Sequence, residues 1–135
     1  MTTVLFACVH NAGRSQMAAA FFNALVNPSQ ARAISAGTAP AARLNPEVVT
    51  AMRENGIELK QATPQKLTPE LAAGAQWLIT MGCGEQCPVV PGTRREDWPL
   101  DDPASLDPAG VRRVRDEIRG RVVELIARER WSALS

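Results

Sequence analysis

The sequence predicts an α/β domain: a parallel sheet with helices on both faces. Apolar segments of strand length alternate with helix-like patterns, and the one long irregular stretch is confined to Gly82–Ser105. No internal repeat interrupts this order, so residues 1–135 are expected to form a single domain. In such sheets ligands bind beyond the carboxyl ends of the strands, so functional residues are expected in the loops that follow them.

The first half of the chain predicts two strand–helix pairs. Thr3–Ala7 is a buried strand, and Ser15–Val26 carries apolar residues at helical spacing. Arg32–Ala36 is the second strand. Asn45-Pro46 is typical of an N-cap followed by proline in the first helical position, and Gly56 ends that helix.

The second half predicts a short helix, a strand and a long helix. Thr68-Pro69-Glu70 repeats the cap-and-proline pattern, for a helix that ends near Gly74. Trp77–Met81 is a buried strand, and Asp107-Pro108 begins the last helix. The apolar stripe of that helix consists of Val111, Val114, Ile118, Val122, Leu125 and Ile126.

Composition excludes several classes of protein. With 15 Lys plus Arg against 14 Asp plus Glu, the chain is neither a strongly basic nucleic-acid binder nor acidic-tailed. No apolar run approaches the roughly 20 residues that span a bilayer. Three cysteines and the missing signal-peptide pattern argue against a disulfide-stapled secreted domain, so we expect reduced thiols in the cytoplasm and neither a membrane nor a nucleic-acid partner.

The turn after the first strand carries the strongest chemical signal. A cysteine, Cys8, and an arginine, Arg14, bracket five residues at a strand-to-helix junction. Backbone N–H groups of such a loop can surround a tetrahedral oxyanion, while the arginine binds two of its oxygens and the same donors favour the thiolate. The alternative is a buried structural cysteine beside a salt-bridging arginine. The predicted oxyanion-binding residues are Val9, His10, Asn11, Ala12, Gly13, Arg14 and Ser15.

Charge distribution favours an anionic ligand at this end of the chain. No Asp or Glu occurs before Glu47, whereas Arg14, Arg32 and Arg43 do. Such a stretch focuses positive potential into a cleft, although short hydrophobic segments also lack acids by chance.

These residues resemble a known family. Cys8–Ser15 resembles the phosphate-binding loop of the low-molecular-weight protein tyrosine phosphatase superfamily, and Arg14–Ala18 resembles its arsenate reductase branch, thioredoxin-coupled or mycothiol-type. The resemblance implies a three-layer sandwich with a four-stranded parallel sheet. Further matching segments are Ser35-Ala36-Gly37, Asn45-Pro46, Thr80-Met81-Gly82-Cys83-Gly84 and Asp101-Asp102-Pro103-Ala104.

Departures from the phosphatase pattern favour the reductase branch. Phosphatases carry Gly where His10 stands and a second cysteine where Gly13 stands, and they have aromatic residues beside the general acid, whereas this chain has no tyrosine. Instead it has Cys83 and Cys87, whose thiols could form a disulfide relay with a reactive cysteine. The alternative is a pair of unreactive loop thiols.

The resemblance also suggests roles for the remaining site residues. It selects Asp102, before a proline, as the general acid over Asp97, Asp101 and Asp107, the last of which is expected to be a helix cap. Asn11 and Ser15 would hold the loop and hydrogen-bond the Cys8 sulfur, with N-cap duty as the alternative for Ser15. His10 is either a pH-sensitive partner of the thiolate or, as we favour, a side chain turned to solvent.

The implied activity is reduction of arsenate to arsenite, with Cys8, Arg14, Asp102, Cys83 and Cys87 as catalytic residues. No bound cofactor is expected. The reductant would be thioredoxin, or a mycothiol- or bacillithiol-type thiol with a glutaredoxin-like partner. The three residues between Cys83 and Cys87 are fewer than in thioredoxin-coupled members and resemble actinobacterial relatives linked to mycothiol.

The sequence also bears on metal binding and on two rival functions. No metal site is expected, because Ala19 and Gln65 stand where the acidic ligands of the family's potassium site would be. One rival function is a phosphatase acting on small or protein phosphomonoesters. The other is a zinc-binding protein that uses Cys8, Cys83, Cys87 and His10, at spacings unusual for a structural site.

Overall fold

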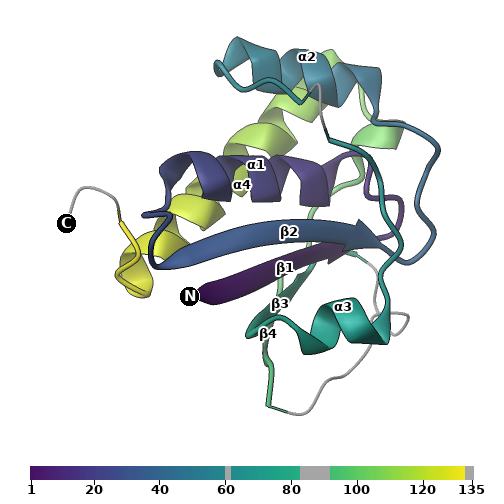
Figure 1. Cartoon of the computed structure of the whole chain (residues 1–135). Helices are drawn as coiled ribbons and strands as arrows, with labels where there is room; N and C mark the ends of the chain where they lie inside the picture. Colours follow the sequence, from purple (N-terminus) through teal and green to yellow (C-terminus); the bar gives the residue numbers. More distant parts are fainter. Residues whose placement is uncertain (60–61, 83–91, 133–135) are drawn as a thin grey trace.

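A computed structural model describes residues 1–59, 62–82 and 92–132 of the chain. Its strands form a four-stranded parallel sheet in the order β2-β1-β3-β4, which confirms the predicted fold class (Figure 1). The elements in chain order are β1 (Thr2–Cys8), α1 (Arg14–Leu25), β2 (Ala31–Gly37), α2 (Pro46–Glu54), α3 (Pro69–Ala73), β3 (Trp77–Thr80), β4 (Arg94–Asp97), the 3-10 turn η2 (Pro103–Ser105) and α4 (Pro108–Arg128).

Helices cover both faces of the sheet. Helices α1, α2 and α4 lie on one face and α3 on the other (Figure 1). Side chains alternate along β1, so Val4 and Phe6 enter the larger core while Leu5 and Ala7 enter the smaller one. Within the described ranges, no helix is both long and apolar enough to cross a bilayer.

The register of the sheet brings three strand ends together. In β1, Cys8 pairs with Gly37 of β2, and Ala7 pairs with Thr80 of β3. The carboxyl ends of the three strands therefore meet at one edge, where ligands bind in parallel α/β sheets.

The helix starts that the sequence predicts are present. The side chain of Asn45 accepts a hydrogen bond from the Glu47 N–H at 2.9 Å. Thr68 caps α3, and Asp107 caps α4 by accepting from the Gly110 N–H at 2.8 Å. Each cap satisfies an N–H group that the first helical turn leaves without a partner.

One element was not located from the sequence. The range predicted as irregular, Gly82–Ser105, contains β4, whose four residues Arg94–Asp97 are all charged and show no apolar alternation. This strand lies at the sheet edge and pairs only with β3 among the described strands. It is held by tertiary contacts: the Arg94 guanidinium lies 4.3 Å from the centre of the Trp77 ring, and the following Trp98 is buried.

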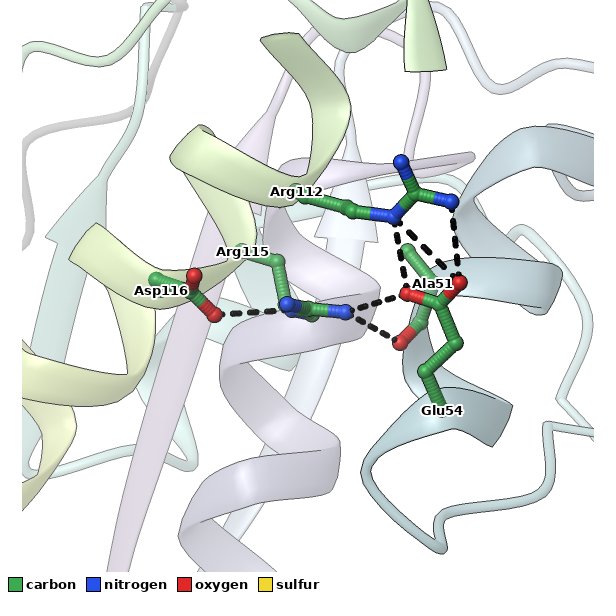
Figure 2. Close-up of polar contacts among 5 residues, drawn as sticks. All are labelled: Ala51, Glu54, Arg112, Arg115 and Asp116. Carbon is green, nitrogen blue, oxygen red and sulfur yellow. Dashed lines mark hydrogen bonds and ion pairs between the residues drawn. The ribbon is translucent and has the colours of Figure 1, made fainter. Parts of the chain in front are cut away.

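An ion-pair network ties α2 to α4 (Figure 2). The carboxylate of Glu54 accepts hydrogen bonds from Arg112 at 3.0 Å and from Arg115 at 2.7 Å. Arg115 also donates to the Ala51 carbonyl at 2.9 Å and pairs with Asp116. The hydrogen bonds from the two arginines hold the pKa of Glu54 below its ordinary value.

Candidate active site

Cys8 lies at the carboxyl end of β1, and the residue is 2% exposed. Its sulfur is 2.9 Å from the Ser15 hydroxyl and accepts a hydrogen bond from the Asn11 N–H at 3.3 Å. A thiolate at this position could accept hydrogen bonds from both groups. Ser15 lies inside α1, whose N-cap is Gly13, so the alternative that Ser15 is the N-cap is wrong.

Asn11 supports this arrangement from the middle of the loop. Its backbone has a φ of +50°, in the left-handed region that asparagine tolerates better than most residues. Its fully buried side chain donates to the Ser15 hydroxyl at 2.7 Å and accepts from the Gln65 N–H at 2.9 Å. Asn11 thus links the loop to a segment more than fifty residues further along the chain.

Six consecutive loop carbonyls, Cys8–Gly13, accept hydrogen bonds from outside the turn. Thr38, Ala39, Ala41 and Asn45 donate backbone N–H groups at 2.8–3.1 Å to the carbonyls of Cys8, Val9, His10 and Ala12. The Gln16 side chain binds the Asn11 carbonyl, and the Met17 N–H binds that of Gly13. Because the C=O and N–H of a peptide unit point in opposite directions, this pattern turns the loop N–H groups the other way, as a cradle for an anion requires.

Arg14 is the first residue of α1, and its side chain is 8% exposed. Its guanidinium donates to the Leu100 carbonyl at 3.1 Å and lies 3.7 Å from the Asp102 carboxylate. Gly82, with a φ of +93°, packs against it, since a Cβ built there would lie 2.5 Å from Nη1. The guanidinium of Arg14 is therefore held between the backbone of Leu100 and that of Gly82.

Asp102 reaches the site from the segment before η2. One carboxylate oxygen accepts from the Ala104 N–H at 3.0 Å, and the other lies 3.7 Å from Arg14 and 4.0 Å from the imidazole of His10. The side chain of His10 is 53% exposed. The structure thus brings Asp102 beside Arg14, while His10 lies at the rim with its imidazole near Asp102.

A cavity of about 290 Å³ opens above Cys8. Within the described part of the chain, no Phe, Trp or Tyr side chain lines it. Its walls are formed by Cys8, His10, Ala12, Gly13, Arg14, Ala41, Arg43, Leu44, Asn45, Pro46, Asp102 and Ala104. Ala41 and the residues from 43 to 46 were not expected to line the site, because only the fold brings the start of α2 over the loop.

Two glycines allow the close packing around the loop. A Cβ at Gly37 would lie 2.5 Å from the Val9 carbonyl oxygen and 2.9 Å from the Asn11 nitrogen. A Cβ at Gly13 would lie 3.3 Å from Pro103, so glycine there lets the segment that carries Asp102 approach. Gly37 was matched in the sequence only as part of a segment, without its packing role.

Comparison with known proteins gives the family. The model of the family "Low molecular weight phosphotyrosine protein phosphatase" matches residues 3–132. The chain belongs to this family. The match spans nearly the whole chain and includes the loop that holds Cys8.

The relatives include proteins named arsenate reductases. An arsenate reductase of Bacillus licheniformis is 37% identical over 130 residues, covering 89% of this chain and 91% of that protein. A solved thioredoxin-dependent arsenate reductase of Corynebacterium glutamicum has a TM-score of 0.81 at 38% identity; the match covers 93% of this chain but 60% of that one. An arsenate reductase in a phosphate-binding state has a TM-score of 0.80 at 31% identity and covers 95% of this chain and 98% of its own.

Two predicted catalytic residues, Cys83 and Cys87, lie outside the described residues. The chain enters the segment that contains them directly from Gly82, which packs against the Arg14 guanidinium. Within the described residues, no group of three or more His, Cys, Asp or Glu gathers as a metal site. The zinc alternative, which needs both loop cysteines, stays untested.

At one of the two positions where the resemblance implies acidic potassium ligands, the structure places hydrogen-bond donors, and at the other an alanine. Gln65 acts as a hydrogen-bond donor here. Its side-chain amide donates to the Ser35 carbonyl at 2.7 Å, and its backbone N–H donates to the side-chain oxygen of Asn11. The Gln16 amide also directs N–H groups at Asn11 and at the Thr63 carbonyl. The oxygens of Asn11, Thr63 and Ser35 therefore already accept hydrogen bonds. The side chain of Ala19 has no atom that could bind a cation.

Proposed function

We propose that this family member reduces arsenate to arsenite, with the sulfur of Cys8 as the nucleophile. The observation that carries the proposal is the cavity above Cys8, which brings together a sulfur, the Arg14 guanidinium and the Asp102 carboxylate, with no Phe, Trp or Tyr among the described residues that line it. A tetrahedral oxyanion would fit this cavity better than a phosphotyrosine ring would. The similarity to proteins named arsenate reductases supports the same choice.

In the first step, the Cys8 thiolate attacks arsenic. The loop N–H groups and Arg14 would hold the arsenate oxygens, with Val9, His10, Asn11, Ala12, Gly13 and Ser15 contributing the rest of the loop. A sulfur–arsenic bond forms and one arsenic–oxygen bond breaks. Asp102, beside Arg14, would protonate the departing oxygen, which leaves as water.

In the second step, another thiolate attacks the Cys8 sulfur. A disulfide forms, the sulfur–arsenic bond breaks, and its electron pair remains on arsenic, which passes from the +5 to the +3 state. Two thiols are thereby oxidised for each arsenate reduced. Cys83 would supply this thiol and Cys87 would then resolve the disulfide, unless an external thiol attacks Cys8 directly.

An external thiol system must restore the reduced enzyme in either case. Similarity to a thioredoxin-dependent reductase supports thioredoxin as the partner. The short spacing between Cys83 and Cys87 supports a mycothiol- or bacillithiol-type thiol with a glutaredoxin-like partner. The site of action is proposed to be the cytoplasm, where such thiols are kept reduced.

Phosphatase activity is the second candidate function, because the family is named for it. The loop would bind phosphate as it binds arsenate, and water could release phosphate from the Cys8 sulfur without electron transfer. The absence of an aromatic wall among the described residues favours small phosphomonoesters as substrates, with low activity.

The test is arsenite formation with each reductant supplied separately. Arsenate is given to the protein with thioredoxin and its reductase, with a glutaredoxin-type system, or with a low-molecular-weight thiol. Turnover with at least one system supports the proposal and identifies the partner. If none yields arsenite while a small aryl phosphate is hydrolysed, the protein is a phosphatase.

A further inference from the structure

The buried side chain of Gln16, in the first turn of α1, has no role in the chemistry above. It is 6% exposed, and its amide nitrogen lies close to three oxygens. These are the carbonyl of Asn11 at 3.1 Å, the side-chain oxygen of Asn11 at 3.2 Å and the carbonyl of Thr63 at 3.3 Å. Because two of the three are backbone carbonyls, which only accept, the atom that faces them must be the nitrogen of Gln16.

The orientation of the Asn11 amide follows in the same way. The Gln65 N–H is a backbone donor, so the Asn11 atom facing it at 2.9 Å must be the oxygen. Gln16 is the second donor to that oxygen. The Asn11 nitrogen is then directed at the Ser15 hydroxyl, to which it donates at 2.7 Å.

The last hydrogen bond, between Ser15 and the Cys8 sulfur, has Ser15 as its donor when Cys8 is a thiolate. Since the Ser15 oxygen already accepts from Asn11, its own hydrogen is free to be donated to the Cys8 sulfur at 2.9 Å. A thiolate has no hydrogen of its own and must accept. Every donor in the series therefore points toward Cys8.

We propose that Gln16 is a positioning residue that stabilises the Cys8 thiolate through Asn11 and Ser15. It acts twice: it binds the Asn11 side chain directly, and through the Thr63 carbonyl it holds the segment whose Gln65 N–H completes the pair of donors. The inference rests on Cys8 being the nucleophile of the proposed function, and it adds a residue that, together with the Gln65 N–H, holds the Asn11 amide in the orientation that directs a donor at Ser15.

The test follows Cys8 alkylation rather than turnover, so it does not depend on arsenate. The full chain is treated with iodoacetamide across a pH range, and the Cys8 peptide is quantified by mass spectrometry. In Gln16→Met and Gln16→Glu, neither of which has the amide donor, the pH of half-maximal Cys8 alkylation should rise by about one pH unit, equivalent to tenfold in the ionisation constant. At high pH, where the thiol is fully ionised, the variants should react as the wild type does.

The matched control is Asn23→Leu. Asn23 also lies in α1, but its side chain exchanges hydrogen bonds with the backbone of Ala33 in β2 rather than with the loop. This variant should lose stability while its alkylation profile stays that of the wild type. Folded Gln16 variants with an unshifted profile would overturn the proposal, as would an equal shift in the control.

A measurement on the wild type covers variants that fail to fold. In a pH titration followed by NMR, the side-chain amide signals of both Asn11 and Gln16 should move at the midpoint of Cys8 alkylation. If the Asn11 signals move and those of Gln16 do not, the coupling ends at Asn11 and the proposal is wrong. Failure of arsenate turnover alone would overturn the proposed function and leave this coupling measurable.

Discussion

Among single residues, Arg14 is predicted to be intolerant even of lysine. Its guanidinium is oriented by the Leu100 carbonyl and by Asp102, so its planar fork has one fixed direction. Lysine keeps the charge but cannot present two parallel donors to an oxyanion. We expect Arg14→Lys to lower kcat/KM for arsenate about 100-fold, as removal of one oxyanion donor does in other enzymes.

Steady-state kinetics on protein with an unchanged melting temperature would measure this effect. A lysine variant within about threefold of the wild type, a difference of less than about 1 kcal/mol in the barrier, would contradict bidentate binding.

Gly37 gives a residue-scale prediction about the shape of the loop. An alanine Cβ there would lie 2.5 Å from the Val9 carbonyl oxygen, so either β2 or the loop must shift. Overpacking of this kind costs about 1–3 kcal/mol of unfolding free energy. Gly37→Ala should show this loss in urea denaturation and should also lose most of its oxyanion affinity.

Gly120 supplies the control. It lies in α4, and a Cβ built there meets nothing within 4 Å. Gly120→Ala should therefore gain up to about 1 kcal/mol from helix propensity and bind phosphate normally. Equal behaviour of the two variants would show that the Gly37 contact does not shape the loop.

At the scale of elements, the link between α2 and α4 predicts a pH-dependent stability. The arginine hydrogen bonds lower the pKa of Glu54 in the folded state. A carboxyl group with a depressed folded pKa contributes stability above its unfolded pKa, and this contribution is lost as the pH falls through the folded value. Glu54→Gln should therefore be less stable than the wild type at neutral pH and equal to it in acid.

Denaturation of both proteins from neutral to acidic pH, at low and high salt, would measure the difference. It should also shrink in high salt, since the pair is partly exposed to solvent. A stability difference that is constant across the pH range would contradict a role for the Glu54 charge.

Elements with local signals could be predicted from the sequence, and those held by distant contacts could not. The starts of α2, α3 and α4 follow from a capping side chain and an adjacent proline. The charged strand β4 carries no such pattern, because it depends on pairing with β3 and on the ring of Trp77. Edge strands need little apolar character, so periodicity misses them.

The site likewise has parts that local sequence predicts and parts that depend on distant contacts. Cys8 and Arg14 bracket one short turn, so their spacing, together with its place at a strand-to-helix junction, predicts an oxyanion cradle. The Leu100 carbonyl and the Gln65 N–H come from segments more than fifty residues away. A backbone N–H or C=O group is the same in nearly every residue, so the sequence does not show which distant one contacts the loop. Only the folded order of the strands brings these groups to it.

Variants of Cys83 and Cys87 would distinguish arsenate reduction from phosphate ester hydrolysis. In the proposed mechanism, hydrolysis would need Cys8, Arg14 and Asp102, whereas reduction would also need a second sulfur to attack Cys8. We expect Cys83→Ser to hydrolyse a small aryl phosphate at nearly the wild-type rate and to lose thioredoxin-supported arsenate reduction. Cys87→Ser should stop one step later, with Cys83 joined to Cys8 after a single turnover.

Mass spectrometry of the single-turnover products would identify the disulfide. If both serine variants reduce arsenate at the wild-type rate with a low-molecular-weight thiol, the internal relay is dispensable. An external thiol then attacks Cys8 itself, and the roles of Cys8, Arg14 and Asp102 are unchanged.

In each reaction proposed for this protein, one sulfur, that of Cys8, forms the bond to the oxyanion. The most direct test of this role is the variant Cys8→Ser, assayed for arsenite formation and aryl phosphate hydrolysis, with phosphate binding measured on the same sample. Both activities should fall at least about 100-fold, the loss typical of a missing nucleophile, while the protein stays folded and still binds phosphate. Arsenite formation above about one per cent of the wild-type rate would contradict the assignment of Cys8.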